Sequence, residues 1–257
     1  MDILLVRKNL AASREKAREM ITSGLIAVDK IPVVKPGHLT LISSNIALIK
    51  PPPPYVSRGG TKLEAALGQF SVDVRGKVFL DVGSSTGGFT DCLLKHGALR
   101  VTAVDVGYGQ FHWKLRQDPR VRVIEKTNIR YMTPETLGER VDGAVIDVSF
   151  ISLRLVISPV SRLLRKKGFI IALIKPQFEV GKDQVGKGGV VRDPRLHEEV
   201  LQSLGGFFHR EGWRVAGTIP SPLLGPKGNR EFFVHLEREN EYSTDADAFA
   251  GTAPDTS

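Results

Sequence analysis

The sequence predicts an α/β protein in which a Rossmann-like parallel sheet, covered by helices on both faces, follows a small N-terminal αβ domain. Three observations support this fold class. From Tyr55 onward, near-continuous apolar runs alternate with helical segments. A glycine-rich turn at residues 81–91 follows the apolar run at residues 78–80. Four consecutive prolines at residues 51–54 separate this region from the N-terminal part of the chain.

Residues 1–50 show the pattern of a compact αβ domain. A helix is predicted over residues 10–24, because Ser13 can cap its start and Gly24 can end it. Short β-type runs follow at residues 25–28, 31–34 and 39–49. Since the proline run after them can only be extended, residues 51–57 are expected to form a stiff linker. The alternative is that the prolines are a ligand for a proline-recognising module.

Residues 58–238 are expected to form the larger domain, which begins with a helix near residues 61–70. Strands are predicted at residues 77–81, 101–105, 121–125, 143–148, 168–175, 213–218 and 231–236. Helices between them are predicted at residues 88–96, 153–164 and 194–211. Residues 239–257 carry five acidic residues and no Lys or Arg, and we expect them to be an acidic, disordered tail.

Composition indicates a soluble protein with a polyanionic partner. The net charge is +8 and the isoelectric point is near 9.6, and Lys and Arg side chains supply most non-specific affinity for nucleic acids. Many basic proteins nevertheless bind no polyanion. Neither a signal peptide nor an apolar run of 18 residues is apparent, so a cytoplasmic location is expected. The lone Cys92 cannot form an internal disulfide and is interpreted as a small buried residue.

The glycine-rich turn has the features of a nucleotide-cofactor site. Asp81 ends the strand, and Gly83, Gly87 and Gly88 allow the backbone to approach a ligand closely. Asp105 lies 24 residues further on, where an acid can accept hydrogen bonds from both ribose hydroxyls of an adenosine. The glycine spacing differs from the G-x-G-x-x-G of dinucleotide enzymes, which favours S-adenosylmethionine over NAD. The alternative is that these glycines serve only the turn.

Charged residues stand at the ends of segments that such a sheet would bring together. Asp147 and Lys175 each end an apolar strand, at the edge where ligands bind in α/β sheets. Lys62 lies near a helix start, where the helix dipole disfavours a cation, so pairing with a carboxylate is expected. Glu231 enters the last strand. The alternatives are solvated charges: a plain surface lysine at Lys62 and an edge-strand charge at Glu231.

Several motifs in order resemble the TlyA-type proteins, known both as haemolysins and as ribosomal RNA 2′-O-methyltransferases. The motifs are Tyr-Val-Ser-Arg-Gly-Gly-x-Lys-Leu from Tyr55, Asp-Val-Gly-Ser-Ser-Thr-Gly-Gly-Phe-Thr-Asp from Asp81, Lys-Pro-Gln-Phe-Glu from Lys175, Gly-Lys-Gly-Gly from Gly186 and Gly-Asn-x-Glu from Gly228. The resemblance implies an S-four-type RNA-binding domain followed by an FtsJ-like methyltransferase domain.

The resemblance also implies site residues. The Lys-Asp-Lys-Glu catalytic tetrad of this class falls on Lys62, Asp147, Lys175 and Glu231. Contacts to S-adenosylmethionine fall on Asp81, Gly83, Ser84, Ser85, Gly87, Gly88, Phe89, Asp105, Val106, Asn128 and Asp147. Basic residues expected to contact RNA are Arg7, Arg14, Lys16, Arg18 and Arg58. No metal site is expected.

The implied activity is 2′-O-methylation of ribosomal RNA, with a cytidine as the expected target and Lys175 nearest the attacking oxygen. Ribosomal RNA or ribosomal subunits would be the partner. Two alternatives come from other classes of protein. One is a haemolysin that acts on membranes, and the other is a catalytically inactive protein that uses the same fold to bind RNA.

Overall fold

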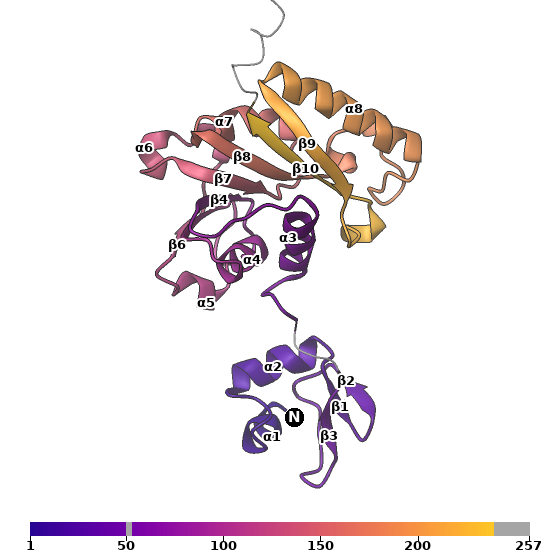
Figure 1. Cartoon of the computed structure of the whole chain (residues 1–257). Helices are drawn as coiled ribbons and strands as arrows, with labels where there is room; N and C mark the ends of the chain where they lie inside the picture. The colour runs from indigo at the N-terminus through magenta and orange to yellow at the C-terminus, as the bar shows by residue number, and fades with distance from the viewer. Residues whose placement is uncertain (50–52, 239–257) are drawn as a thin grey trace, which may run out of the picture. The chain divides into compact units, whose positions relative to one another are not determined.

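The computed structural model describes residues 1–49 and 53–238, and the chain divides into two compact units (Figure 1). The first unit ends at Pro54 and the second starts at Tyr55. The acidic tail expected at residues 239–257 and the first two prolines of the expected linker lie outside the described residues.

The first unit packs two helices against an antiparallel sheet of order β2-β1-β3. Its elements are α1 (Asp2–Arg7), α2 (Arg14–Thr22), β1 (Ile26–Val28), β2 (Ile31–Val33) and β3 (Ile46–Leu48). Ser13 caps α2 as predicted, because its Oγ accepts from the backbone N–H of Lys16 at 3.1 Å. The helix therefore starts at Arg14 and not at residue 10.

The structure differs from the sequence-based expectation for this unit in two further respects. The short helix α1 was not foreseen, because six residues give too little periodicity to recognise, yet Leu4 and Leu5 are buried on its inner face. The strand expected at residues 39–49 is confined to β3, because the chain before it forms an exposed loop in which Leu39 is 95% exposed.

The expected linker differs from the structure at residues 55–57, which belong to the second unit. Tyr55 is buried, and Gly60 lies so close to it that a Cβ there would be 2.3 Å from the Tyr55 ring. The backbone N–H of Val56 donates to Asp91 Oδ2 at 2.8 Å. Ser57 caps the next helix by accepting from the N–H of Gly59 at 3.3 Å. These contacts fix the end of the linker on the larger unit.

The second unit is built on a seven-stranded sheet of order β6-β5-β4-β7-β8-β10-β9. The strands are β4 (Val78–Val82), β5 (Arg100–Val104), β6 (Val121–Ile124), β7 (Val141–Ile146), β8 (Leu164–Ile174), β9 (Trp213–Pro220) and β10 (Phe232–Arg238). The predicted parallel sheet is correct for the first five, but β10 is antiparallel to both β8 and β9. Because β10 lies between β8 and β9, Glu231 does not enter an edge strand.

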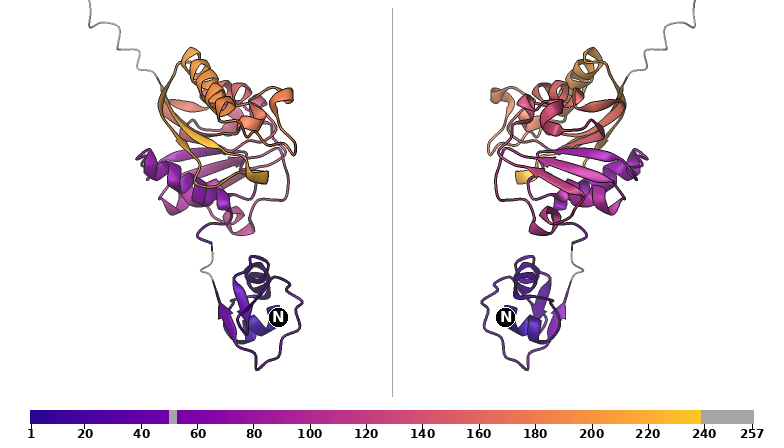
Figure 2. Two further views of the ribbon diagram at one scale, coloured as in Figure 1. Left: turned by 90° about the vertical axis from the view of Figure 1, so that its right-hand side faces the viewer. Right: turned by 90° about the vertical axis from the view of Figure 1, so that its left-hand side faces the viewer.

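Helices cover both faces of this sheet (Figures 1 and 2). On one face are α3 (Arg58–Gln69), α4 (Gly88–Lys95) and the short α5 (Trp113–Arg116). On the other are α6 (Pro134–Leu137), α7 (Ile157–Ser161) and α8 (Pro194–Arg210). The helix predicted at residues 153–164 is reduced to a 3-10 turn, Leu153–Leu155, and α7, because Leu164 already pairs with Val141 in the sheet.

Candidate active site

Five charged residues meet at one edge of the larger sheet. Asp81 lies in β4, Asp147 follows β7 and Lys175 follows β8, so all three stand at the carboxyl ends of parallel strands. In the antiparallel pairing of β10 with β8, Phe232 lies opposite Ile174. The start of β10 therefore reaches the same edge, which brings Glu231 to this site. Lys62, in the second turn of α3, approaches from the helix layer.

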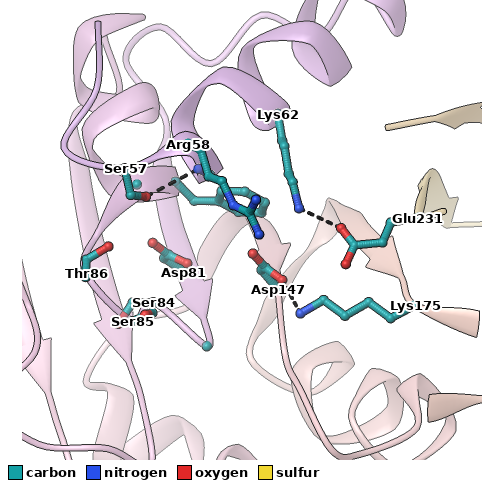
Figure 3. A pocket seen from close by; sticks show the side chains of 14 residues that line it. Ser57, Arg58, Lys62, Asp81, Ser84, Ser85, Thr86, Asp147, Lys175 and Glu231 are labelled. Carbon is teal, nitrogen blue, oxygen red and sulfur yellow. Dashed lines mark hydrogen bonds and ion pairs between the residues drawn. The ribbon is translucent and has the colours of Figure 1, made fainter. Parts of the chain in front are cut away.

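Two ion pairs face each other across this edge (Figure 3). Lys62 Nζ lies 2.6 Å from Glu231 Oε2, and Lys175 Nζ lies 2.6 Å from Asp147 Oδ1. Lys175 Nζ also donates to Ser149 Oγ at 2.9 Å. Lys62 and Glu231 are 5% and 2% exposed, so the pairing expected for Lys62 is present and is buried. Removing one member of such a pair leaves an uncompensated buried charge and typically costs about 3–5 kcal/mol.

All four residues line one cavity of about 240 Å³ that also contains the glycine-rich turn. The lining residues are Ser57, Arg58, Gly59, Lys62, Asp81, Gly83, Ser84, Ser85, Thr86, Gly88, Phe89, Asp147, Lys175 and Glu231. Arg58 was expected to contact RNA, and it extends from the start of α3 toward the ion pairs (Figure 3). Ser57 and Gly59 were not predicted as site residues, although both belong to the motif that starts at Tyr55, whereas Thr86 lies within the predicted glycine-rich turn.

The glycine-rich turn is shaped by close backbone contacts. Gly83 has a φ of +79°, and a Cβ at this position would lie 2.7 Å from the carbonyl oxygen of Asp147. A Cβ on Gly88 would lie 2.1 Å from Ser57 Oγ. Only glycine lets the turn approach both the end of β7 and the start of α3. The turn is therefore held directly beside the ion pair of Asp147 and Lys175.

Three buried carboxylate oxygens of the cavity residues have no hydrogen-bond partner in the described part of the chain, but one of them, Oδ1 of Asp147, is ion-paired with Lys175. Asp81 is fully buried, and its Oδ2 accepts from the N–H of Thr90 at 2.9 Å and from Thr90 Oγ1 at 2.6 Å. Its Oδ1 has no partner, and neither has Oε1 of Glu231. Burial raises the pKa of Asp81 to about 7, with Thr90 opposing the shift. Unpaired buried acceptors are costly, so both oxygens are suited to donors of a bound molecule.

The predicted cofactor residues divide into two groups. Seven of them line the cavity: Asp81, Gly83, Ser84, Ser85, Gly88, Phe89 and Asp147. Gly87 is the N-cap of α4 and faces Phe111 and Leu115, where a Cβ would collide with both side chains. Asp105, Val106 and Asn128 lie outside the cavity lining.

Asp105 supports the turn. Its Oδ2 accepts from the N–H of Ser85 at 2.8 Å, and its Oδ1 accepts from the N–H of Gly107 at 2.7 Å. Val106 is 69% exposed, and Asn128 caps the 3-10 turn Ile129–Tyr131 by accepting from the N–H of Arg130 at 3.1 Å. The predicted contacts of these three residues with the cofactor therefore remain predictions.

The basic residues predicted to bind RNA in the first unit are partly engaged within it. Arg14 and Arg18 both donate to Oδ2 of the buried Asp2, at 3.1 and 3.0 Å. Burial acts to raise the pKa of Asp2, but these bonds and the N–H of Ile3 lower it to about 2. Lys16 pairs with Glu19 at 2.8 Å. Arg7, Arg14 and Arg18 are nevertheless exposed, so their guanidinium groups stay accessible to a polyanion.

Comparisons with known proteins agree with this division of the chain. The model of the FtsJ-like methyltransferase family matches residues 55–238, and the model of the S4 domain matches residues 1–39. The 16S/23S rRNA (cytidine-2′-O)-methyltransferase TlyA of Mycobacterium tuberculosis (strain H37Rv) is 46% identical over 96% of this chain and 92% of its own. Hemolysin A of Brachyspira hyodysenteriae is 40% identical over 87% of this chain and 93% of its own.

A solved structure titled "Putative hemolysin from Streptococcus thermophilus" has a TM-score of 0.73 and 42% identity, covering 92% of this chain and 87% of that one. Across residues 1–49 and 53–238, no helix has both the length and the apolar character needed to span a membrane. The larger unit, with its glycine-rich turn and its edge of paired charges, matches the FtsJ-like model over its whole described length. The chain therefore belongs to the FtsJ-like methyltransferase family and carries an S4 domain before the methyltransferase domain.

Proposed function

We propose that this protein transfers a methyl group from S-adenosylmethionine to a ribose 2′-hydroxyl of ribosomal RNA, at a cytidine. The observation that carries the proposal is the meeting of two ion pairs with a cofactor-type glycine turn in one cavity. The names of relatives such as TlyA, together with the S4 domain, support RNA as the substrate. Action on ribosomal RNA also supports the cytoplasm as its location.

The cavity fits S-adenosylmethionine, which supplies a methyl group on a positively charged sulfur. The unpartnered Oδ1 of Asp81 would accept a hydrogen bond from the ammonium group of the cofactor. The backbone of residues 83–85 would line the cofactor, since glycine at position 83 permits close approach. Asp105 would keep the turn in place through its bond to Ser85 and bind the adenosine ribose.

The two ion pairs would act on the RNA. A 2′-hydroxyl is a weak nucleophile, so it needs in-line placement, which can lower a barrier by roughly 7–11 kcal/mol. The ammonium of Lys175, held by Asp147 and Ser149, would stabilise the negative charge that develops on the attacking oxygen. The bond between the sulfur and the methyl carbon would break as the bond from the ribose oxygen to the methyl carbon forms, S-adenosylhomocysteine would leave, and the hydroxyl proton would pass to water. Lys62 and Glu231 would hold the target ribose, with Oε1 of Glu231 free to accept from one of its hydroxyls.

Ribosomal particles without 2′-O-methyl groups test this proposal directly. The wild-type protein is incubated with them and with S-adenosylmethionine labelled in the methyl group, and the labelled nucleotide is mapped. Label on a ribose that resists alkaline cleavage of the adjacent phosphodiester is the expected result. Label on a base, or no label at all, would reject the proposed function. Dye release from liposomes by the pure protein would instead favour a haemolysin.

A further inference from the structure

Two exposed basic loops stand beside Glu231 and have no role in the function proposed above. The Lys187 loop comprises residues 186–192 and carries Lys187 and Arg192, and the Lys227 loop comprises residues 225–230 and carries Lys227 and Arg230. All four cations are exposed, and the described residues provide none of them with an ion-pair partner. Neither loop contains a carboxylate. Together they form a purely cationic stretch of surface next to the site.

The buried side chain of Asn229, in the Lys227 loop, is hydrogen-bonded to the backbone of the Lys187 loop. It is 3% exposed, its Nδ2 donates to the carbonyl of Gly189 at 2.9 Å, and its Oδ1 accepts from the N–H of Val191 at 3.1 Å. Its own carbonyl accepts from the N–H of Gly225 at 2.8 Å, which closes the Lys227 loop. Because the Lys187 loop offers one acceptor and one donor, a side-chain amide is matched to both, whereas a carboxylate would lack the donor.

The same residue lies two positions before Glu231, and the Lys227 loop packs against that carboxylate, whereas the Lys187 loop is linked to it indirectly. A Cβ on Gly225 would lie 2.0 Å from Oε1 of Glu231, so the Lys227 loop is in direct contact with the side chain. From the other loop, the carbonyl of Val191 accepts from the buried His197 Nε2 at 3.0 Å. The His197 ring lies 5.7 Å from the ring of Phe232, the residue after Glu231. The loops and Glu231 are therefore positioned by one set of contacts.

We infer that the two loops bind phosphates of the RNA substrate, and that Asn229 is a positioning residue that couples their placement to Glu231 and Lys62. The inference rests on the proposed function and adds a second RNA contact, on the methyltransferase domain itself. Cations that neutralise phosphates give affinity and register to a nucleic-acid complex. At this edge of the sheet they would hold the backbone flanking the target ribose. The buried amide then sets the position of Glu231 relative to that backbone.

Charge removal tests the phosphate-binding surface. Lys187→Gln combined with Arg192→Gln is compared with Lys166→Gln combined with Lys167→Gln. The control pair lies near the start of β8, whereas Lys175 follows the end of that strand, and both of its lysines are exposed. Two lost phosphate contacts should lower the slope of log affinity for RNA against log salt by about 1.5 in the first variant only. An unchanged slope, or an equal change in the control, would overturn the inference.

Asn229→Ala tests the coupling. With the amide gone, kcat should fall by about 10-fold to 100-fold because the ribose-binding pair is misplaced, while the dissociation constant for S-adenosylmethionine stays near the wild-type value. Thermal unfolding and cofactor binding verify that the variant is folded. Asn229→Ser is the milder second variant, since its hydroxyl retains one hydrogen-bonding group at this buried position. A folded Asn229→Ala protein with wild-type kcat would refute the coupling.

These outcomes are separable from those of the proposed function. Methyl transfer by the wild-type protein is measured first, and its absence would reject the proposed function alone. The salt dependence of RNA binding needs no turnover, so it decides the phosphate-binding surface in either case. If RNA binding by the wild-type protein depends on salt but the slope does not respond to Lys187 and Arg192, the surface lies elsewhere.

Discussion

Asp81 and Glu231 show at the scale of single residues how the cavity is prepared for a ligand. One oxygen of Asp81 accepts hydrogen bonds from Thr90, and one oxygen of Glu231 accepts from Lys62. The other oxygen of each carboxylate is buried and has no hydrogen-bond partner among the described residues. A buried acceptor left unpaired costs about 1–3 kcal/mol, so its presence at a cofactor-type turn indicates a function. Asp81 offers the clearer test, because burial raises its pKa to about 7.

Cofactor binding should depend on the ionisation of Asp81. A ligand ammonium favours the carboxylate, so the affinity for S-adenosylmethionine should fall by up to about tenfold per pH unit below about pH 7. Asp81→Asn should weaken binding at pH 8 and flatten this dependence. Calorimetry in buffers of different ionisation enthalpy measures the proton released on binding. The same proton release in Asp81→Asn would show that another group is responsible.

The same shift affects the stability of the protein without ligand. The pKa of Asp81 is raised from 3.8 to about 7 on folding, so between these values the native state holds a proton that the unfolded chain has released. The contribution of Asp81 to stability is therefore most favourable below about pH 4 and declines as the pH rises to about 7. Binding of a cationic ligand would offset this loss.

At the scale of secondary-structure elements, the site depends on the fit of the turn after β4 against the end of β7. Gly83→Ala would place a methyl group 2.7 Å from the carbonyl of Asp147, in a backbone conformation with a φ of +79°. Stability should fall by about 1–3 kcal/mol, and the affinity for S-adenosylmethionine by at least about tenfold, because the turn and Asp147 are pushed apart.

Gly76→Ala is the matched control for this variant. Gly76 has a similar φ of +69°, but no atom lies within 4 Å of a Cβ at that position. The Gly76→Ala variant should have the same backbone strain as Gly83→Ala but should bind the cofactor with wild-type affinity. Thermal unfolding and cofactor titration of both variants separate strain from collision. If the two variants lose cofactor affinity equally, the contact with Asp147 has no special role.

The sequence predicted most elements of the larger unit, and the misses have physical reasons. β4 and the second half of β8 are buried and nearly continuous apolar runs, which a sequence pattern detects well. The antiparallel direction of β10 escaped prediction because an apolar pattern carries no direction. The α1 helix escaped because it is too short, and the helix expected at residues 153–164 was overestimated because apolar residues that enter a buried strand fit the same pattern.

The candidate site residues that the sequence predicted are charged residues that directly follow apolar runs. Asp147 and Lys175 are recognisable at strand ends, and the structure brings them together with Lys62 and Glu231. Ser149, which binds Lys175, gives no comparable signal, because an exposed serine in a loop is ordinary. The buried amide of Asn229 was likewise not singled out, since its partners are backbone groups from a loop some 40 residues away.

At the scale of the whole molecule, the two units have separate hydrophobic cores, so each is expected to fold by itself. A protein that starts at Tyr55 should bind S-adenosylmethionine with wild-type affinity, because every residue lining the cavity lies beyond Pro54. It should bind ribosomal RNA more weakly and with a smaller salt slope, because it lacks the S4 domain and its exposed arginines.

Calorimetry and RNA-binding titrations of the truncated and full-length proteins check this prediction. Loss of cofactor binding in the truncated protein would mean that the first unit takes part in the cofactor site. Unchanged RNA affinity would mean that the S4 domain adds nothing to substrate recognition.

Methyl transfer by Lys175→Ala decides whether the ammonium of Lys175 acts on the ribose hydroxyl. The full-length variant is assayed with saturating S-adenosylmethionine and ribosomal particles, and its cofactor affinity is measured in parallel. Removing the cation that we propose to lie beside the attacking oxygen should lower the rate of transfer by at least about 100-fold, with cofactor affinity close to that of the wild type. A folded Lys175→Ala protein that methylates ribosomal RNA at nearly the wild-type rate would rule out this role for Lys175.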